Sequence, residues 1–371
     1  MSKLNKNDDS GLFATTYADA RALFLAAAGA AGATLTAYVH PTARGPNDGL
    51  GGQLSIDVAV VGASKAQRAL VVVCGTHGPE GYLGSAAQLA LLEDLRLSGP
   101  PPDTRIVFIH GLNPYGFAWW SRTTENNVDL NRNFIDYSLP LGRNEAYAEL
   151  HAVLCPSDWT PVTQAAGHAA NAAWIAKHGF PAWLDGISRG QYDEPTGLSF
   201  GGVAPEWSST TLEEIVDRHL QGVDRVGLIE WHTGLGDYGE PFFLCFNEPD
   251  GALWQRCADW WGRARLEDQG GFGGGVRPEY TGLVFHGLQR FLAPAEMAGA
   301  VIEFGTGPID NMFDWLRIDR WVRFGADDGQ REARRQGVRD AFCPPDPAWR
   351  SGVIASAREI QRMALKGVAA W

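Results

Sequence analysis

The sequence predicts an α/β protein, a three-layer α/β/α sandwich whose central sheet is mixed and mostly parallel. The first observation is a set of short, continuous apolar runs at residues 69–75, 105–111, 225–234 and 300–307, which are typical of strands buried on both faces. The second is that helical patterns separate several of these runs. Buried strands that alternate with helices form largely parallel sheets covered by helices on both faces.

Local patterns predict the remaining elements of the N-terminal third. Residues 17–30 have the apolar spacing of a helix, and residues 35–40 and 53–62 are predicted strands, the second of which alternates apolar and polar positions. A helix is predicted from about residue 83 to residue 97. It ends at the following Ser-Gly-Pro-Pro-Pro, because proline cannot continue a helix.

The whole chain, residues 1–371, is predicted to form a single catalytic α/β domain. The stretch at about residues 140–211 holds two candidate helices and a segment rich in glycine, proline and tryptophan. We expect this stretch to be an insertion that covers one edge of the site.

Composition limits the possible partners and the compartment. The formal net charge is −12, which argues against binding to nucleic acid or to an anionic membrane. The five cysteines are scattered, which suggests neither a disulfide framework nor a thiolate zinc site. The apolar run at residues 22–33 is shorter than the ~20 residues that span a bilayer, and acidic residues precede it. We predict that this run is a buried helix and that the protein is cytoplasmic.

Ionisable side chains follow the predicted strands at their carboxyl ends, where open α/β sheets bind ligands. His77 and Glu80 lie in Cys-Gly-Thr-His-Gly-Pro-Glu-Gly after the run at 69–75, and His232 lies in Glu-Trp-His-Thr-Gly. Two imidazoles and one carboxylate are the protein ligands of a catalytic zinc ion, whose fourth position stays open for water. The His-x-x-Glu pattern alone arises often by chance.

Further motifs make the pattern specific. Over about residues 50–310 the chain resembles the zinc carboxypeptidase superfamily, which includes aspartoacylase and succinylglutamate desuccinylase. The pieces occur in the order of that superfamily: His77 and Glu80, Asn-Pro-Tyr-Gly at 113–116, Arg122, Asp-Leu-Asn-Arg-Asn-Phe at 129–134, His232 and Glu303. Gly-Gln-Tyr at 190–192 and Gly-Gly-Val-Ala-Pro-Glu-Trp-Ser at 201–208 resemble an uncharacterised bacterial branch of these carboxypeptidase-like metallopeptidases.

The resemblance implies a metal site and the groups that act beside it. His77, Glu80 and His232 would hold one Zn²⁺ ion, which lowers the pKa of bound water and polarises the scissile carbonyl. Glu303 would be the general base that takes the proton of the water and passes it to the leaving amine. Arg122 would stabilise the developing oxyanion.

The resemblance also implies substrate-binding residues. Asn131 and Arg132 would bind the free carboxylate of the substrate, since a guanidinium matches the geometry of that group. Asp129 would orient His77 through its second ring nitrogen. Tyr280 follows the glycine-rich run at 270–275. We expect it to contact substrate from a closing loop but to have no catalytic part.

These features predict a zinc-dependent hydrolase that cleaves an amide or peptide bond next to a free carboxylate in a small molecule or short peptide. A carboxypeptidase and an N-acyl-amino-acid deacylase of the aspartoacylase type both remain open. A non-catalytic binding protein on the same scaffold is a further alternative. A purely structural zinc site is disfavoured, since such sites are closed by four ligands and the sequence offers no fourth.

Overall fold

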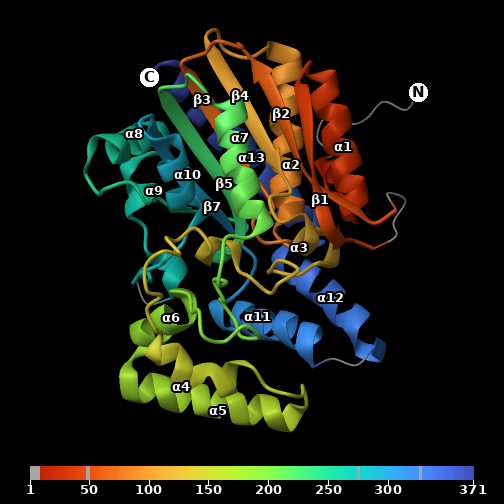
Figure 1. The fold of residues 1–371 in the computed structure, drawn as a ribbon, viewed down its shortest axis with the longest axis vertical. Helices are drawn as coiled ribbons and strands as arrows, with labels where there is room; N and C mark the ends of the chain where they lie inside the picture. The colour runs from red at the N-terminus through yellow and green to blue at the C-terminus, as the bar shows by residue number, and fades with distance from the viewer. Residues whose placement is uncertain (1–8, 47–50, 274–275, 326–327) are drawn as a thin grey trace.

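The computed structural model describes residues 9–46, 51–273, 276–325 and 328–371. Within these residues seven strands form one sheet, in the order β1-β2-β4-β3-β5-β7-β6 (Figure 1). The central strands β4, β3, β5 and β7 are parallel to one another, whereas β1, β2 and β6 join as antiparallel neighbours. The mixed sheet is therefore confirmed, with a parallel centre and antiparallel pairings at both sides. The strands are β1 (Thr34–Arg44), β2 (Gln53–Gly62), β3 (Arg68–Val73), β4 (Thr104–His110), β5 (Arg225–Tyr238), β6 (Pro241–Leu244) and β7 (Glu296–Gly305).

Helices cover both faces of the sheet, as predicted. Side chains alternate along β3, so that Leu70 and Val72 pack into the core on one face while Val71 and Val73 pack into the core on the other. The first face is covered by α1 (Tyr17–Ala30), α2 (Gly81–Ser98), α8 (Ala252–Trp261) and α13 (Pro347–Ala369). The second is covered by α7 (Trp207–His219) and α10 (Val284–Leu292) (Figure 1).

The apolar run at residues 22–33 lies mostly in α1, which buries only one of its faces. Phe24 and Ala28 are buried, whereas Leu23 is 39% exposed. The predicted helix is thus correct. It is only half-buried, because α1 packs one side against a face of the sheet and turns its other side to solvent (Figure 1). No helix among the described residues combines the length and the apolar composition needed to cross a membrane.

A further group of helices lies beyond the carboxyl ends of the parallel strands. It contains α4 (Glu145–Leu154), α5 (Pro161–His178) and α6 (Phe180–Ser188), together with α11 (Ile309–Phe324) and α12 (Asp328–Phe342) (Figure 1). The prediction of two helices within residues 140–211 is wrong, because three form there before α7 begins. Pro181 occupies the first turn of α6, where a proline starts a helix instead of breaking one.

The remaining short elements connect the strands to this edge. They are η1 (Asp9–Leu12), α3 (Pro114–Trp119), η2 (Leu130–Arg132), α9 (Arg263–Glu267) and η3 (Gly270–Phe272). Because β3, β5 and β7 are parallel neighbours, their carboxyl ends meet at one edge of the sheet. His232 of β5 lies directly opposite Glu303 of β7 in the register, so both side chains lie on the same face.

Candidate metal centre

The turn from β3 into α2 carries His77 and Glu80 and is held in place by close backbone packing. A Cβ atom at Gly78 would lie 1.9 Å from the carbonyl carbon of Gly116, so only glycine fits at this position. Gly116 belongs to the Asn-Pro-Tyr-Gly motif, in which the Asn113 side chain caps the start of α3. These two motifs are distant in sequence, and their contact places His77 and Glu80 at the carboxyl end of the sheet.

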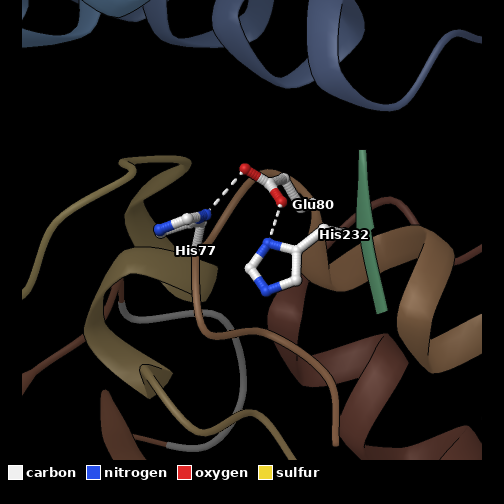
Figure 2. A group of neighbouring side chains, drawn as sticks. All are labelled: His77, Glu80 and His232. Atoms are coloured by element: carbon white, nitrogen blue, oxygen red, sulfur yellow. Dashed lines mark hydrogen bonds and ion pairs between the residues drawn. The ribbon is translucent and has the colours of Figure 1, made fainter. Parts of the chain in front are cut away.

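His77, Glu80 and His232 are brought together as the sequence predicted. One donor atom from each lies within 4.8 Å of the other two, and all three side chains are buried. The Nδ1 atom of His77 lies 2.9 Å from Glu80 Oε1, and the Nδ1 atom of His232 lies 2.8 Å from Glu80 Oε2 (Figure 2). Two imidazole nitrogens and a carboxylate that converge in this way can hold a single metal ion.

The charges of this group are mutually stabilised. Burial by itself would raise the pKa of Glu80, but the two adjacent imidazoles outweigh it and hold that pKa well below its usual value. Burial by itself would lower the pKa of His232, but the carboxylates of Glu80 and Glu230 outweigh it and raise that pKa well above its usual value. A buried carboxylate that stays ionised between imidazoles is suited to a divalent cation.

The outer nitrogen of each imidazole contacts a second carboxylate. His77 Nε2 lies 3.1 Å from Asp129 Oδ1, and His232 Nε2 lies 2.9 Å from Glu230 Oε1. An Nε2–H that donates to a carboxylate leaves the Nδ1 lone pair free for a metal ion. The donor set thus fits a zinc ion both in its ligands and in the groups that orient them.

Glu230 is missing from the residues that the sequence singled out. It is completely buried on β5 and accepts a second hydrogen bond, of 2.8 Å, from Thr76 Oγ1. The signal was present, since an acidic residue two positions before His232 on a strand must lie on the same face of the sheet. An ionisable residue inside an otherwise apolar strand is itself unusual.

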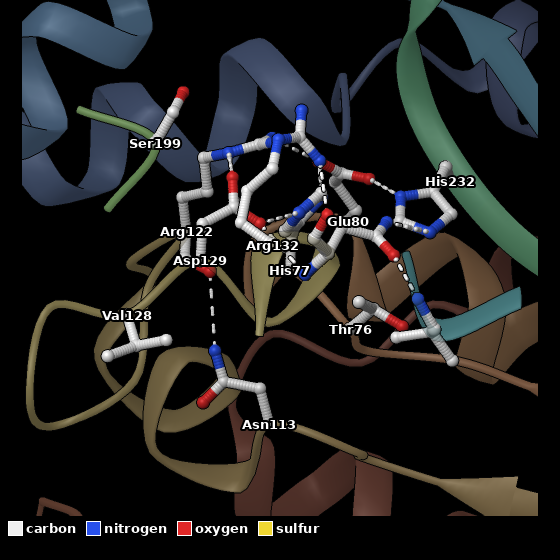
Figure 3. Close-up of polar contacts among 12 residues, drawn as sticks. Thr76, His77, Glu80, Asn113, Arg122, Val128, Asp129, Arg132, Ser199 and His232 are labelled. Atoms are coloured by element: carbon white, nitrogen blue, oxygen red, sulfur yellow. Dashed lines mark hydrogen bonds and ion pairs between the residues drawn. The ribbon is translucent and has the colours of Figure 1, made fainter. Parts of the chain in front are cut away.

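Arg122 and Asp129 form one network beside the three candidate ligands (Figure 3). Arg122 donates from Nε to Asp129 Oδ2 over 3.0 Å, and its Nη1 lies 3.4 Å from Glu80 Oε1. Asp129 also accepts from the backbone N–H of Asn131 at the start of η2. Burial would raise the pKa of Asp129, but Arg122 and His77 hold it well below the usual value. Asp129 therefore links the candidate ligands to the segment that carries Asn131 and Arg132.

The side chains of Asn131 and Arg132 both line the cavity beside the centre. Asn131 Oδ1 accepts from the backbone N–H of Val284, and its Nδ2 lies 3.5 Å from His232 Nε2. Arg132 donates from Nε to the carbonyl of Ser188 over 2.7 Å, and its guanidinium lies over the ring of Tyr280 at 5.0 Å. Burial lowers the pKa of Arg132, which marks this cation as one that lies away from bulk water.

The loop that carries Tyr280 is anchored directly after this residue. Gly282 has a φ of +69°, and a Cβ atom at this position would lie only 2.4 Å from the carbonyl oxygen of Arg132. The side chain of Thr281 donates to the carbonyl of Arg189 at the end of α6 over 2.8 Å. In the glycine-rich run before Tyr280, residues 274–275 lie outside the described residues.

Glu303 stands apart from these ion pairs. It is 8% exposed and lines the same cavity, and its Oε2 lies 3.5 Å from the backbone nitrogen of Leu235. Burial and the neighbouring carboxylate of Glu80 raise the pKa of Glu303 to about 8. The site thus holds two carboxylates whose pKa values are shifted in opposite directions: that of Glu80 is lowered and that of Glu303 is raised.

The cavity beside the candidate metal centre is small, with about 130 Å³ open to water-sized groups. It brings together the sequence-predicted site residues that line it: His77, Glu80, Arg122, Asn131, Arg132, His232, Tyr280 and Glu303. Asp129 lies behind this surface, in contact with His77 and Arg122.

A family model described as "Protein of unknown function (DUF2817)" matches residues 13–356. The chain belongs to this family. No curated protein matches the sequence.

Solved structures similar to this DUF2817 protein include a carboxypeptidase, a putative metallopeptidase and an aspartoacylase family protein. Carboxypeptidase A from Helicoverpa armigera matches with a TM-score of 0.51 and 13% identity, over 96% of this chain and 73% of that one. A putative metallopeptidase from Shewanella denitrificans matches with a TM-score of 0.41 and 15% identity, over 88% and 90% of the two chains. An aspartoacylase family protein from Mesorhizobium loti gives 0.38 and 14%, over 80% and 68%. The first match establishes a carboxypeptidase-like α/β fold, as the sequence motifs implied.

Proposed function

We propose that this DUF2817 protein is a zinc-dependent hydrolase that cleaves an amide or peptide bond next to a free carboxylate. The observation that carries the proposal is the convergence of His77, Glu80 and His232 beside a separate carboxylate, Glu303, in one cavity. A zinc ion held by these residues would supply a Lewis acid for the scissile carbonyl and an activated water.

Glu303 is the proposed general base. Its carboxylate takes the proton from the attacking water and delivers it to the amine that leaves when the C–N bond breaks. A pKa raised to about 8 supports this assignment, because the group can accept and release a proton near neutral pH. Arg122, which is partly buried and lies next to Glu80, would supply positive charge to the carbonyl oxygen on which negative charge develops.

Arg132 and Asn131 are the proposed binding site for the free carboxylate of the substrate. Arg132 is 4% exposed and lines the cavity, so an anion that reaches it leaves water and interacts strongly. Tyr280 holds the guanidinium from one side and would contact substrate without a catalytic part.

We further propose that residues 140–211 are an insertion of a single catalytic domain that covers one edge of this site. Leu184 and Ser188 of α6 line the cavity. The Ser188 carbonyl also fixes Arg132. The insertion would thus supply part of the substrate-binding wall.

The test is hydrolysis of a panel of N-acyl amino acids and short peptides by the zinc-loaded protein, before and after treatment with a chelator. We expect cleavage that the chelator abolishes and that added zinc restores. Loss of rate when residues beyond the acyl group are removed would favour a peptidase, whereas indifference would favour a deacylase. Stoichiometric zinc without cleavage of any substrate would favour the binding-protein alternative.

Replacement of Arg132 by alanine is expected to raise KM about 10- to 100-fold for substrates with a free carboxylate, since a charged hydrogen bond is lost. The matching substrates with a carboxamide in place of the carboxylate should be affected much less. Steady-state kinetics on both series measures the difference. Equal effects on the two series would contradict the assigned role.

Replacement of Glu230 by alanine is expected to weaken zinc binding about 10- to 100-fold, because His232 loses the acceptor that orients it. Zinc affinity is measured by competition with a chromophoric chelator. Glu230→Gln keeps an acceptor oxygen and should retain most of the affinity. Alanine and glutamine variants with the affinity of the natural protein would show that Glu230 does not position His232.

A further inference from the structure

The cavity beside the candidate metal centre has a polar end and an extended apolar wall. Strand residues form part of this wall. Val301 lies two residues before Glu303 on β7, so its side chain is on the same face of the sheet as that of Glu303. Leu244 of β6 is paired with Val301 in the register. Both apolar side chains are buried and line the cavity, so the wall begins next to the proposed general base.

Apolar side chains of the cavity extend to Arg132 on two sides. On α6, Leu184 lies one turn before Ser188, whose carbonyl accepts the hydrogen bond of Arg132. On the other side Tyr280 stacks on Arg132, and its ring lies 6.0 Å from the ring of Phe246. A group bound between Arg132 and Glu303 therefore lies along apolar side chains.

The base of the wall is closed by Phe272 of η3, which is 1% exposed and packs against Phe242 with ring centroids 5.3 Å apart. Leu184, Leu244, Phe272 and Val301 belong to one hydrophobic cluster. The wall is thus a continuation of a packed core, and its shape is set by residues that have little freedom to move.

Acidic and basic side chains in the cavity all belong to the proposed catalytic and carboxylate-binding groups. Among the described residues that line it, these are His77, Glu80, Arg122, Arg132, His232 and Glu303. Arg122 already contacts Asp129 and Glu80, which leaves Arg132 for one substrate carboxylate. Along the apolar wall itself, a second carboxylate or an ammonium group on the substrate would be buried without a charged partner, which is costly.

We propose that the residue whose carboxylate binds Arg132 carries an uncharged, apolar side chain. The substrates would be N-acyl or peptidyl derivatives of amino acids of the leucine or phenylalanine kind, and not derivatives of acidic or basic amino acids. This inference rests on the proposed hydrolase function and narrows its substrate class.

The first test compares N-acetyl-amino acids that share one acyl group and differ only in the side chain: Leu, Phe, Gly, Asp and Lys. For the zinc-loaded protein we expect kcat/KM for the Leu and Phe derivatives to exceed that for Gly about 10- to 100-fold, from burial of the apolar side chain. The Asp and Lys derivatives should fall below Gly. Equal or faster cleavage of either charged derivative than of the Leu derivative would overturn the proposal.

A binding measurement separates this proposal from the hydrolase function. Calorimetry compares 3-phenylpropanoate, which has one carboxylate and an apolar group, with acetate, which has one carboxylate and no comparable apolar group. Neither carries a second carboxylate that could bind the zinc ion. We expect 3-phenylpropanoate to bind the zinc-loaded protein at least about tenfold more tightly. That result without cleavage of any amide would refute the hydrolase function and leave the selectivity intact. Acetate binding as tightly or more tightly would refute the selectivity, whether or not amides are cleaved.

Substitution in the wall gives an independent check. Leu184→Lys places a cation opposite the bound side chain and should raise kcat/KM for the Asp derivative relative to the Leu derivative about tenfold. Val162→Lys, which makes the same charge change on α5 at a residue that is 78% exposed, should leave the ratio unchanged. If Leu184→Lys does not fold, Leu184→Ala should lower the preference for Leu and Phe over Gly. An unaltered preference in the folded Leu184 variant would contradict the proposal.

Discussion

Replacing Glu303 by glutamine is expected to lower kcat about 1,000-fold, the effect of losing a positioned general base. Glutamine keeps the size of the side chain but cannot accept the proton of the attacking water. Zinc content should not change, since the candidate ligands are His77, Glu80 and His232. Glu248→Gln, on the exposed surface, makes the same chemical change away from the cavity and should keep full activity.

The pH dependence of the same variant gives a second readout. Burial and Glu80 raise the pKa of Glu303 to about 8, and a bound cation would lower it by stabilising the carboxylate. Glu303 is protonated and inactive as a base below its pKa, so kcat/KM should rise about tenfold per pH unit until the pKa is passed. We expect the midpoint below 8 in the zinc-loaded protein and the loss of this limb in Glu303→Gln. Activity with an unchanged pH limb in the variant would assign the base elsewhere.

Removing one candidate ligand is expected to abolish metal binding and hydrolysis together. His232→Ala leaves one imidazole and one carboxylate, which is fewer than the three protein ligands of catalytic zinc sites. Zinc measured by plasma emission should fall from about one ion per chain to near zero, and amide cleavage should become undetectable.

The control for this experiment is His168→Ala. His168 pairs with Asp314 at the surface, and its side chain is 55% exposed, so zinc content and activity should be those of the natural protein. Retention of one zinc ion by His232→Ala, with hydrolysis intact, would place the catalytic metal site outside the three residues proposed.

Much of the fold could be predicted from the sequence because its strands have local signatures. The apolar runs at 69–75 and 105–111 correspond closely to β3 and β4, and residues 53–62 are the bounds of β2. The region at 140–211 was harder. There, Pro181 starts α6 and does not break the segment, and helix starts and helix breaks share the same residue type.

The candidate site, like the fold, could be predicted from the sequence only in part. The position of His77, Glu80 and His232 after predicted strands indicated that they would meet, since the ends of parallel strands share one edge of a sheet. The resemblance to the zinc carboxypeptidase superfamily added Arg122 and Glu303. Glu230 was missed because spacing alone does not tell which buried acidic residue has a partner. Its contact with His232 appears only once the rings are oriented.

The amino-acid order by itself therefore determined the type of sheet and the three candidate metal ligands, because each depends on short patterns and strand ends. The separate carboxylate, Glu303, followed from the order of motifs shared with the zinc carboxypeptidase superfamily. Only the tertiary structure decided the apolar wall between Glu303 and Arg132. That wall is built from β6, β7, α6 and η3, segments far apart in the chain. Its composition is a property of packing between elements, which no local pattern encodes.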